Sequence, residues 1–391
     1  PRPAPLGATM ESVLAAGRRL NPALRAAALD TSAAAAKADG ADALDDPVIS
    51  DSYSYYRDPG VFSGHAIMVT QAFPLWGKRS LRREAALADL DAMRGREQAA
   101  RDALDERIKL AFAQYYVASR AVAVNRDVIA VAGSMRAAAE ARYAAGRGDQ
   151  PAVIKALGEE TAAAIETARL EGDHAAAREV LNALLARPGG APLAEPLRLR
   201  PVPAGGLAIA SLVERARGGS PALAASGAEV SAARTRATLA EKAWYPDLTV
   251  VAGPLIQTNN RPPGVAATVG LNIPLPWGKE ASEQQAATAQ LGAAQQRYEA
   301  ALLDIQSALG EARARLKAAR NAGALVGYKA LPEARAALKA ITADYAQGRG
   351  ELATALDAQH RVHDLELKFL QLQLVEQTML AAIERLIGGE L

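Results

Sequence analysis

Apolar and polar positions alternate with two different periods along this chain. In residues 279–345, apolar side chains recur at spacings built from three and four residues, at Leu291, Tyr298, Leu302, Ile305, Leu309, Ala312, Leu316 and Ala319. That spacing predicts a long helix with a coiled-coil seam. Shorter segments rich in valine, isoleucine and threonine, such as 265–273, are bounded by turn residues and predict strands.

The same motifs occur twice and in the same order, about 200 residues apart, which indicates a tandem internal repeat. The matching pairs are Asn21-Pro22-Ala23-Leu24 with Ser220-Pro221-Ala222-Leu223, Pro74-Leu75-Trp76-Gly77-Lys78 with Pro274-Leu275-Pro276-Trp277-Gly278-Lys279, and the turns Tyr143 to Gly148 with Tyr345 to Gly350. We therefore predict a first repeat at 1–187, a Pro/Gly-rich equatorial linker at 188–206, and a second repeat at 207–391.

Each repeat is expected to contain an alanine-rich helix, a β-hairpin, a long helix and a return helix. The hairpins are expected at 48–74 and 247–275, the long helices at 77–143 and 279–345, and the return helices at 151–187 and 351–387. A helix of that length would extend roughly 100 Å at 1.5 Å per residue, which exceeds the needs of a globular domain. The fold class is therefore mixed α and β, dominated by coiled-coil helices.

The predicted strands suggest a membrane-spanning sheet that several chains complete together. They are about 8 to 11 residues long, which is close to what a tilted transmembrane strand requires. Four strands cannot close a barrel, and hydrocarbon does not tolerate open sheet edges. Two chains would supply 8 strands, three would supply 12 and four would supply 16. A barrel of 8 strands is too narrow for an open lumen. The sequence does not distinguish between three and four chains.

Composition removes several other classes of function. The chain has no cysteine, so a thiol nucleophile and a cysteine-based zinc site are excluded. A net charge of +2 does not indicate the basic surface that nucleic-acid binding requires. The carboxylates are spread along helices and no glycine-rich phosphate loop follows a strand, so we expect no enzyme and no cofactor. The sequence opens at Pro1, as expected of a processed or trimmed chain.

Histidines do not form a recognisable metal site in the sequence. Of His65, His174, His360 and His363, the last two share a helix face, but a site would need further ligands beside them. We interpret both as ordinary helix residues and predict no metal site.

The repeat, the hairpin that opens into a very long helix after Pro-x-Trp-Gly-Lys, and the paired Tyr-x-x-Gly turns resemble the TolC-type outer-membrane factors, the outer membrane efflux protein family. The resemblance covers nearly the whole chain. It implies a homotrimer with a long α-helical barrel and a 12-stranded barrel, four transmembrane β-strands coming from each chain. It places the protein in the outer membrane of a Gram-negative bacterium, with a large periplasmic part. The phrase from Phe73 to Arg79 is similar to the CzcC-like heavy-metal efflux branch.

The function implied by the resemblance is a passive exit duct of a tripartite efflux system. Its partners would be a periplasmic adaptor (membrane fusion protein), an inner-membrane pump of the RND type and outer-membrane lipid. Heavy-metal cations are one expected cargo, drug or protein export is an alternative, and a soluble coiled-coil scaffold with a small surface hairpin is a competing class. Partition into the outer-membrane fraction distinguishes a duct from a scaffold. The sequence does not decide the cargo, the cognate pump, N-terminal lipidation or the resting state of the gate.

Two sets of residues are candidates for contacts with lipid and adaptor. Trp76, Lys78, Trp277 and Lys279 lie where strand gives way to helix, as in an aromatic belt whose lysines reach headgroups. A packed strand-to-helix corner is the alternative. The glycines of the paired turns, Gly146, Gly148, Gly348 and Gly350, are expected to form periplasmic tips that meet the adaptor, because glycine permits tight turns and close approach.

A third set is carried over from the family's periplasmic gate. Tyr345 matches the gate tyrosine, Asp357 matches one acidic position, and Arg349 lies one residue before the gate arginine. The other acidic positions fall on Thr354 and Ala152, with Asp149 close to the latter. Arg147 and Asp149 are the next candidates on the first repeat, and a plain turn between helices is the alternative for the whole set.

Overall fold

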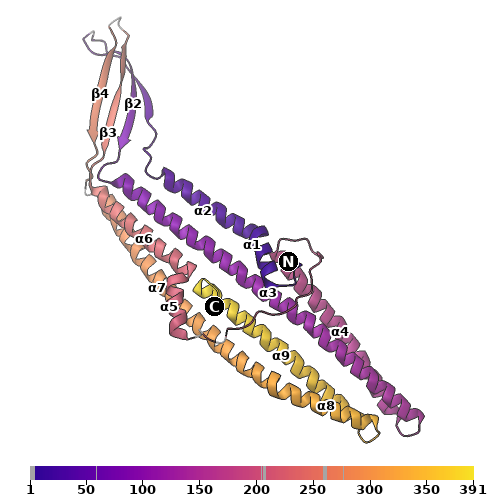
Figure 1. The fold of residues 1–391 in the computed structure, drawn as a ribbon. Helices are drawn as coiled ribbons and strands as arrows, with labels where there is room; N and C mark the ends of the chain where they lie inside the picture. The colour runs from indigo at the N-terminus through magenta and orange to yellow at the C-terminus, as the bar shows by residue number, and fades with distance from the viewer. Residues whose placement is uncertain (1–4, 59, 204, 206–207, 259–261, 276) are drawn as a thin grey trace. The chain divides into compact units, whose positions relative to one another are not determined.

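The computed structural model describes residues 5–58, 60–203, 205, 208–258, 262–275 and 277–391 (Figure 1). Small parts of the expected repeats and linker lie outside the described residues, namely 1–4 and 59 in the first repeat, 204 and 206 in the linker, and 207 and 259–261 in the second repeat. Pro276 of the repeated motif lies outside them as well. Among the described helices, none combines the length and hydropathy needed to cross a membrane.

The first half of the chain forms helices and two strands in the order α-α-β-β-α-α. The elements are α1 (Met10–Leu20), α2 (Pro22–Gly40), β1 (Val48–Ser54), β2 (Gly64–Phe73), α3 (Lys78–Ala144) and α4 (Gln150–Leu184). The second half follows with α5 (Ile209–Gly219), α6 (Pro221–Glu241), a 3-10 turn (Lys242–Trp244), β3 (Leu248–Gln257), β4 (Gly264–Leu271), α7 (Lys279–Leu325), α8 (Leu331–Ala346) and α9 (Leu352–Ile387). The sequence did not predict α1 and α5.

The second long helix differs from the uninterrupted helix expected at 279–345. A π-helical turn, Val326–Ala330, separates α7 from α8. Pro332 lies in the first turn of α8 and has no backbone N–H to donate, so the regular i to i−4 ladder is already broken there. A widened turn relieves that break at low cost and is a known place for local bending.

The described part of the chain divides into two compact units that do not follow the two repeats. One unit comprises Pro1–Arg25, Gln98–Ser220 and Asp304–Leu391, and the other comprises Ala26–Glu97 and Pro221–Leu303. Each unit therefore takes segments from both halves of the chain. We call them the tip unit and the sheet unit, because the first holds the helical turns and the second holds the strands.

In the sheet unit, the described strands form one antiparallel sheet in the order β1-β2-β3-β4. The central pairing joins the two halves of the chain, with Phe73 opposite Leu248 and Thr70 opposite Val251. Helices of this unit pack through small residues: a side chain at Gly95 would lie 2.8 Å from the backbone nitrogen of Ala225. Close helix contact is therefore built on glycine and alanine rather than on large side chains.

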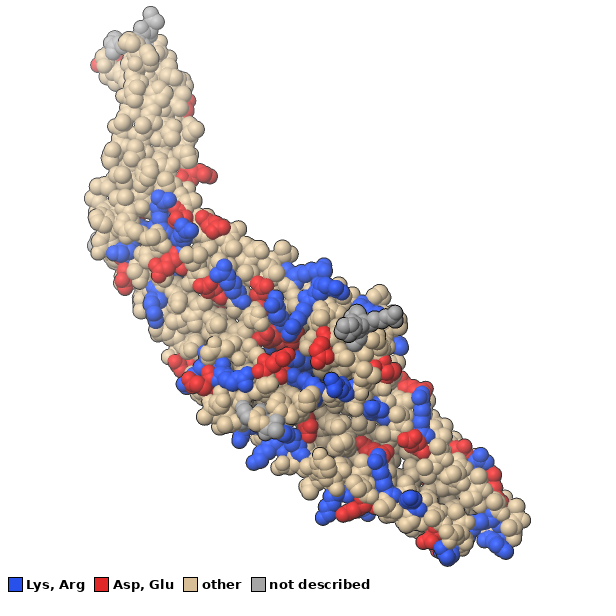
Figure 2. Space-filling model, in the orientation of Figure 1, with Lys and Arg blue, Asp and Glu red and all other residues tan. Residues whose placement is uncertain are grey.

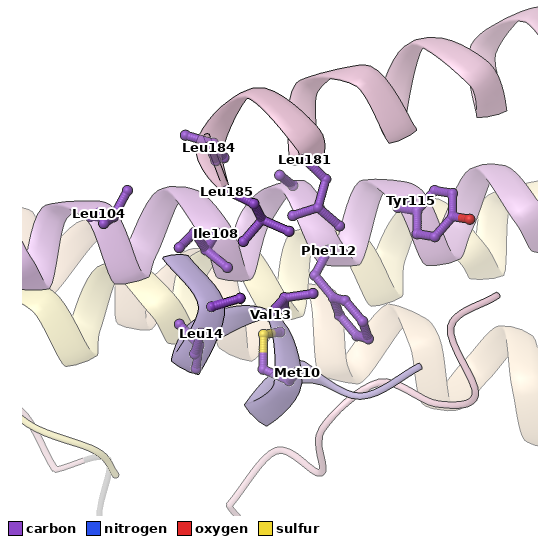
Figure 3. Close-up of a cluster of buried hydrophobic side chains, with 12 residues drawn as sticks. Met10, Val13, Leu14, Leu104, Ile108, Phe112, Tyr115, Leu181, Leu184 and Leu185 are labelled. Atoms are coloured by element: carbon purple, nitrogen blue, oxygen red, sulfur yellow. The ribbon is translucent and has the colours of Figure 1, made fainter. Parts of the chain in front are cut away.

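In the tip unit, the main apolar core joins α1, α3 and the end of α4 (Figure 3). Its largest fully buried side chains are Ile108, Phe112 and Tyr115 of α3 and Leu181 and Leu185 at the end of α4. Each such side chain contributes about 1.5–3 kcal/mol by leaving water. The core fixes the end of the return helix against the middle of the long one.

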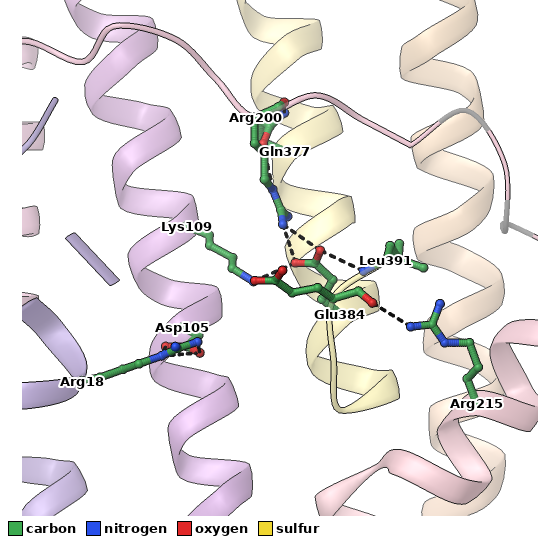
Figure 4. A network of polar contacts seen from close by, with 9 residues as sticks. Arg18, Asp105, Lys109, Arg200, Arg215, Gln377, Glu384 and Leu391 are labelled. Carbon is green, nitrogen blue, oxygen red and sulfur yellow. Dashed lines mark hydrogen bonds and ion pairs between the residues drawn. The ribbon is translucent and has the colours of Figure 1, made fainter. Parts of the chain in front are cut away.

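A buried polar network lies in the same unit (Figure 4). The Glu384 carboxylate accepts hydrogen bonds from Lys109 Nζ at 2.8 Å and from Arg200 Nη1 at 2.6 Å. Gln377 Nε2 donates to the Arg200 carbonyl at 2.9 Å. Because Arg200 belongs to the segment between the halves, this network attaches the linker to α3 and α9.

Candidate functional site

The sheet presents two chemically different faces. Successive side chains of a strand point to opposite sides, so the register assigns each residue to a face. One face, here the apolar face, carries Ile49, Tyr53, Ile67, Val69, Phe73, Leu248, Val250, Ile256, Val265, Val269 and Leu271. The opposite face carries mainly small and polar residues such as Ser50, Ser52, Thr70, Thr249, Thr268 and Gly270, together with the apolar Val48, Met68, Val251 and Leu255.

The apolar face is exposed in this chain. Val265 is 82% exposed and Val269 70% exposed, which is unusual for valines in a sheet. On the side seen in Figure 2, the strands carry almost no basic or acidic atoms. The polar residues on the apolar face are Gln71 and a pair, in which His65 Nδ1 lies 3.0 Å from the Asp51 carboxylate. A surface of this kind is suited to contact with hydrocarbon.

The sheet also has unpaired outer strands. Within the described residues, β1 and β4 each pair on one side only, and they run in opposite directions. An antiparallel partner strand could therefore join either edge, and β4 of one copy could pair with β1 of another without changing the pattern. Exposed sheet edges of this length are templates for association.

The first strand-to-helix corner is held by Lys78, which is buried rather than directed to solvent. Its ammonium donates to both carboxylate oxygens of Asp247, at 2.8 and 2.9 Å, and to the Tyr245 carbonyl at 2.8 Å. The expectation that Lys78 reaches lipid headgroups is therefore wrong, because the buried ammonium needs this carboxylate. Trp76 stays half-exposed, with Nε1 donating to the Pro246 carbonyl at 2.7 Å.

The second corner is open. Trp277 is 86% exposed and Lys279 is exposed at the start of α7. Gly278 has a φ of +100°, a conformation that favours glycine, and it turns the chain from strand into helix. The two copies of the Trp-Gly-Lys motif thus have different surroundings, and only the second leaves its lysine free to reach outward.

Both helical turns have the same backbone. Gly146 and Gly348 lie in the left-handed region, with φ of +66° and +81°. In each turn the glycine N–H bonds the tyrosine carbonyl three residues back at 3.0 Å, and the next N–H bonds the carbonyl five residues back at 2.9 Å. This is the Schellman arrangement that ends helices. Gly148 and Gly350 are needed for a second reason, because a side chain there would lie 3.1 and 3.3 Å from the tyrosine nitrogens.

A groove of about 410 Å³, here the tip groove, lies between the two turns. Tyr345 lines it and is 4% exposed, packed with Met135, Leu352 and Leu356. Burial raises the pKa of the Tyr345 phenol, so the hydroxyl stays protonated well above neutral pH. The Arg142 guanidinium lies over the Tyr345 ring, 4.9 Å from its centroid.

The structure brings together only part of the expected gate. Asp149 lines the tip groove with Tyr345, at the start of α4. Arg349 instead pairs with Asp344 of its own turn at 3.3 Å, and Arg147 is exposed on the first turn. Asp357 is exposed on α9, where it lines another groove beside His360 and Arg361. Tyr345 and Asp149 are therefore neighbours, whereas Arg349 and Asp357 face elsewhere.

Potential metal ligands are dispersed over the part of the chain that the structure describes. No group of three or more His, Asp, Glu or Cys residues there could hold a metal ion. His360 Nε2 lies 3.0 Å from the Glu159 carboxylate, and the His174 ring stacks on Tyr115 at 4.8 Å. These contacts account for two of the histidines as structural residues.

Arg142 is the functional candidate that sequence reasoning missed. It precedes Tyr143 in the first repeat, and the matching position before Tyr345 is Asp344. A reversal of charge at equivalent positions of a repeat was the available signal. The partners of Arg142 are about 200 residues away in the sequence, and only the folded chain brings them together. Local spacing in the sequence therefore could not identify them.

Comparison with known proteins agrees with this geometry. Residues 212–389 match the family of outer membrane efflux proteins. The chain has the fold of VceC, an outer membrane protein of Vibrio cholerae, with a TM-score of 0.82, 18% identity, and coverage of 97% of this chain and 96% of VceC. CusC, known for transmembrane channel formation, gives a TM-score of 0.81 at 17% identity, covering 97% and 93% of the two chains.

The resemblance to the outer membrane efflux protein family is thereby confirmed. The matched family and the structural neighbours are outer-membrane channels, and the prediction that the chain is not an enzyme is confirmed with them. Among individual proteins, the chain is similar to the cobalt-zinc-cadmium resistance protein CzcC of Cupriavidus metallidurans. The two are 29% identical over 330 residues, which are 80% of this chain and 74% of CzcC.

Proposed function

We propose that this chain is one protomer of a trimeric outer-membrane exit duct in a tripartite efflux system. The observation that carries the proposal is the two-faced sheet with an open edge on each side. Three copies joined from β4 to β1 would form a closed 12-stranded barrel, with the apolar face toward lipid and the polar face toward a lumen. We favour three copies over four because of the resemblance to TolC-type factors.

The described helices would continue the duct into the periplasm. Gly146, Gly148, Gly348 and Gly350 would form tips that meet a periplasmic adaptor, which in turn joins an inner-membrane pump of the RND type. Trp76, Trp277 and Lys279 would lie at the lipid interface. Energy and selection of cargo would come from the pump, so the duct itself would conduct passively.

Heavy-metal cations are the cargo that we propose, on the likeness to CzcC. Drug or protein export through the same duct is the alternative. A deletion strain that becomes sensitive to cobalt, zinc or cadmium, and recovers with the intact gene, would support metal export. Sensitivity to drugs alone, with unchanged tolerance of the metals, would contradict it.

Two neighbouring residues offer a matched test of the membrane assignment. Val269 lies on the apolar face and Thr268 on the opposite face of β4. Val269→Arg should cost about 2–4 kcal/mol near the bilayer centre and deplete folded trimer from the outer-membrane fraction. Thr268→Arg, which adds the same charge toward the lumen, should leave trimer abundant.

Membrane fractionation and light scattering with detergent correction would measure how much folded trimer each variant forms. Equal amounts of trimer for the two would contradict a lipid-facing apolar side. A monomer with intact strands, recovered without detergent, would instead support the scaffold alternative.

The resting duct would be closed at the tips by Tyr345, Asp149, Arg349, Arg147 and Asp357. Hydrogen bonds to charged groups near water contribute about 1.5–3 kcal/mol each, which suits a reversible closure. Replacing Tyr345 with Phe and Arg349 with Ser together should raise single-channel conductance in planar bilayers. Asp357→Asn should lower cation preference, because a carboxylate ring attracts cations. Folded trimers with parental conductance and selectivity in both cases would place the gate elsewhere.

A further inference from the structure

We propose that Arg142 is the residue that holds the two helical turns of one protomer together, and that its release is required for the tips to separate. This inference rests on the proposed duct function. It assigns a role to a residue that neither repeat motif singles out, and it begins from the contacts of one side chain in the tip unit.

Arg142 belongs to the first turn, but its side-chain contacts are on the second. Its guanidinium lies over the Tyr345 ring at 4.9 Å, and Nη1 donates to the carbonyl of Gly350 at 3.3 Å and to that of Tyr345 at 3.5 Å. One guanidinium nitrogen thus donates to both carbonyls while the planar cation covers the ring. The contacts join α3 to the end of α8 and the start of α9.

The electrostatic setting favours this placement. The last carbonyls of α8 carry the negative end of the helix dipole, and a cation near them is stabilising. Asp344 adds a negative charge in the same last turn, and Asp149 lines the groove from the first hairpin. From the end of α3, the extended Arg142 side chain reaches the ring and both carbonyls together.

The same contacts can be broken without unfolding the tips. Arg142 is only partly buried, whereas Tyr345 and its apolar neighbours are buried. Each turn keeps its own backbone bonds, which do not involve the Arg142 side chain. The side chain therefore adds a polar connection, nearest to the turns, to the apolar packing of Met135 against Tyr345.

The test uses the absence of cysteine in the chain. Ala145→Cys and Ala346→Cys place spin labels on exposed alanines of the two turns. Arg142→Met keeps an unbranched stem but removes the charge and the donors, and Arg142→Lys keeps the charge without the fork. Arg101→Met is the matched control, an exposed arginine of α3 outside the tip groove.

In detergent-solubilised trimers, Arg142→Met should lengthen and broaden the shortest distance between the labels, measured by double electron–electron resonance. In planar bilayers it should raise single-channel conductance several-fold. Arg142→Lys should give intermediate values, and Arg101→Met should match the parent.

If the parental trimers conduct, and Arg142→Met changes neither the conductance nor the distance between the labels, the inference is overturned. The proposed duct function would then still stand. Parental protein that forms no channels would overturn the proposed function instead. If Arg142→Met does not assemble, Arg142→Lys decides between the same two results.

Discussion

The two helical turns of the tip unit have the same backbone and different side-chain environments. Both end in the same hydrogen-bonding pattern, yet Tyr143 is 50% exposed and Tyr345 is 4% exposed. Before the tyrosine, the first turn has Arg142, which contacts the second turn, and the second has Asp344, which pairs with Arg349 of its own turn. Glycine positions thus fix the shape of a turn, while the charge before the tyrosine sets whether that residue's ionic and cation–π contacts are with the neighbouring turn or with its own.

The largest expected difference is between the two tyrosines. Tyr345→Ala removes a buried aromatic ring and should destabilise the tip unit by about 3–5 kcal/mol. Tyr143→Ala, at the equivalent exposed position, should change stability by less than about 0.5 kcal/mol. Thermal unfolding followed by far-UV circular dichroism in detergent compares the two, and equal losses would show that the turns are not different in burial.

The glycines should behave alike, in contrast to the tyrosines. Gly146→Ala and Gly348→Ala each place a side chain in the left-handed region, which costs roughly 1–2 kcal/mol. The same unfolding measurement should give similar losses for both. A loss at one turn only would mean that the shared backbone pattern is not what stabilises the turns.

The smallest effect is expected at the exposed ion pair of the second turn. Arg349→Ser breaks the contact with Asp344, and exposed pairs contribute only about 0.2–1 kcal/mol. Conductance of this single variant should therefore rise only slightly, well below that of Arg142→Met. A rise for Arg349→Ser as large as that for Arg142→Met would make Arg349 a main contact of the gate.

Local sequence signals located the elements but not their partners. The long helix expected at 77–143 is observed as Lys78–Ala144, and the return helix expected at 351–387 as Leu352–Ile387. Proline, glycine and helical periodicity act within a few residues, so such bounds are visible in the sequence. The π-helical turn at Val326–Ala330 was not predicted, because the helix at 279–345 was expected to be uninterrupted.

Contacts between the two repeats could not be predicted from these local signals. Lys78 finds Asp247, and Arg142 finds Tyr345, across about half of the chain in each case. From the sequence, Lys78 was expected to reach lipid headgroups and Arg142 was not singled out. Only the pairing of β2 with β3 and the packing of the hairpins gives them their partners. Sequence alone therefore named Tyr345 correctly as a residue of interest without finding the side chain that engages it.

The Glu384 network has a consequence for the order of folding. One buried carboxylate joins Lys109 of the first long helix, Arg200 of the linker and the N–H of Leu391, the last residue of the chain. None of these contacts can form until α9 packs beside α3, and burying Lys109 or Arg200 there without this carboxylate would be strongly destabilising. The linker and the first repeat therefore reach their final arrangement only after α9 has joined them, which makes closure of the tip unit depend on a segment far along the chain.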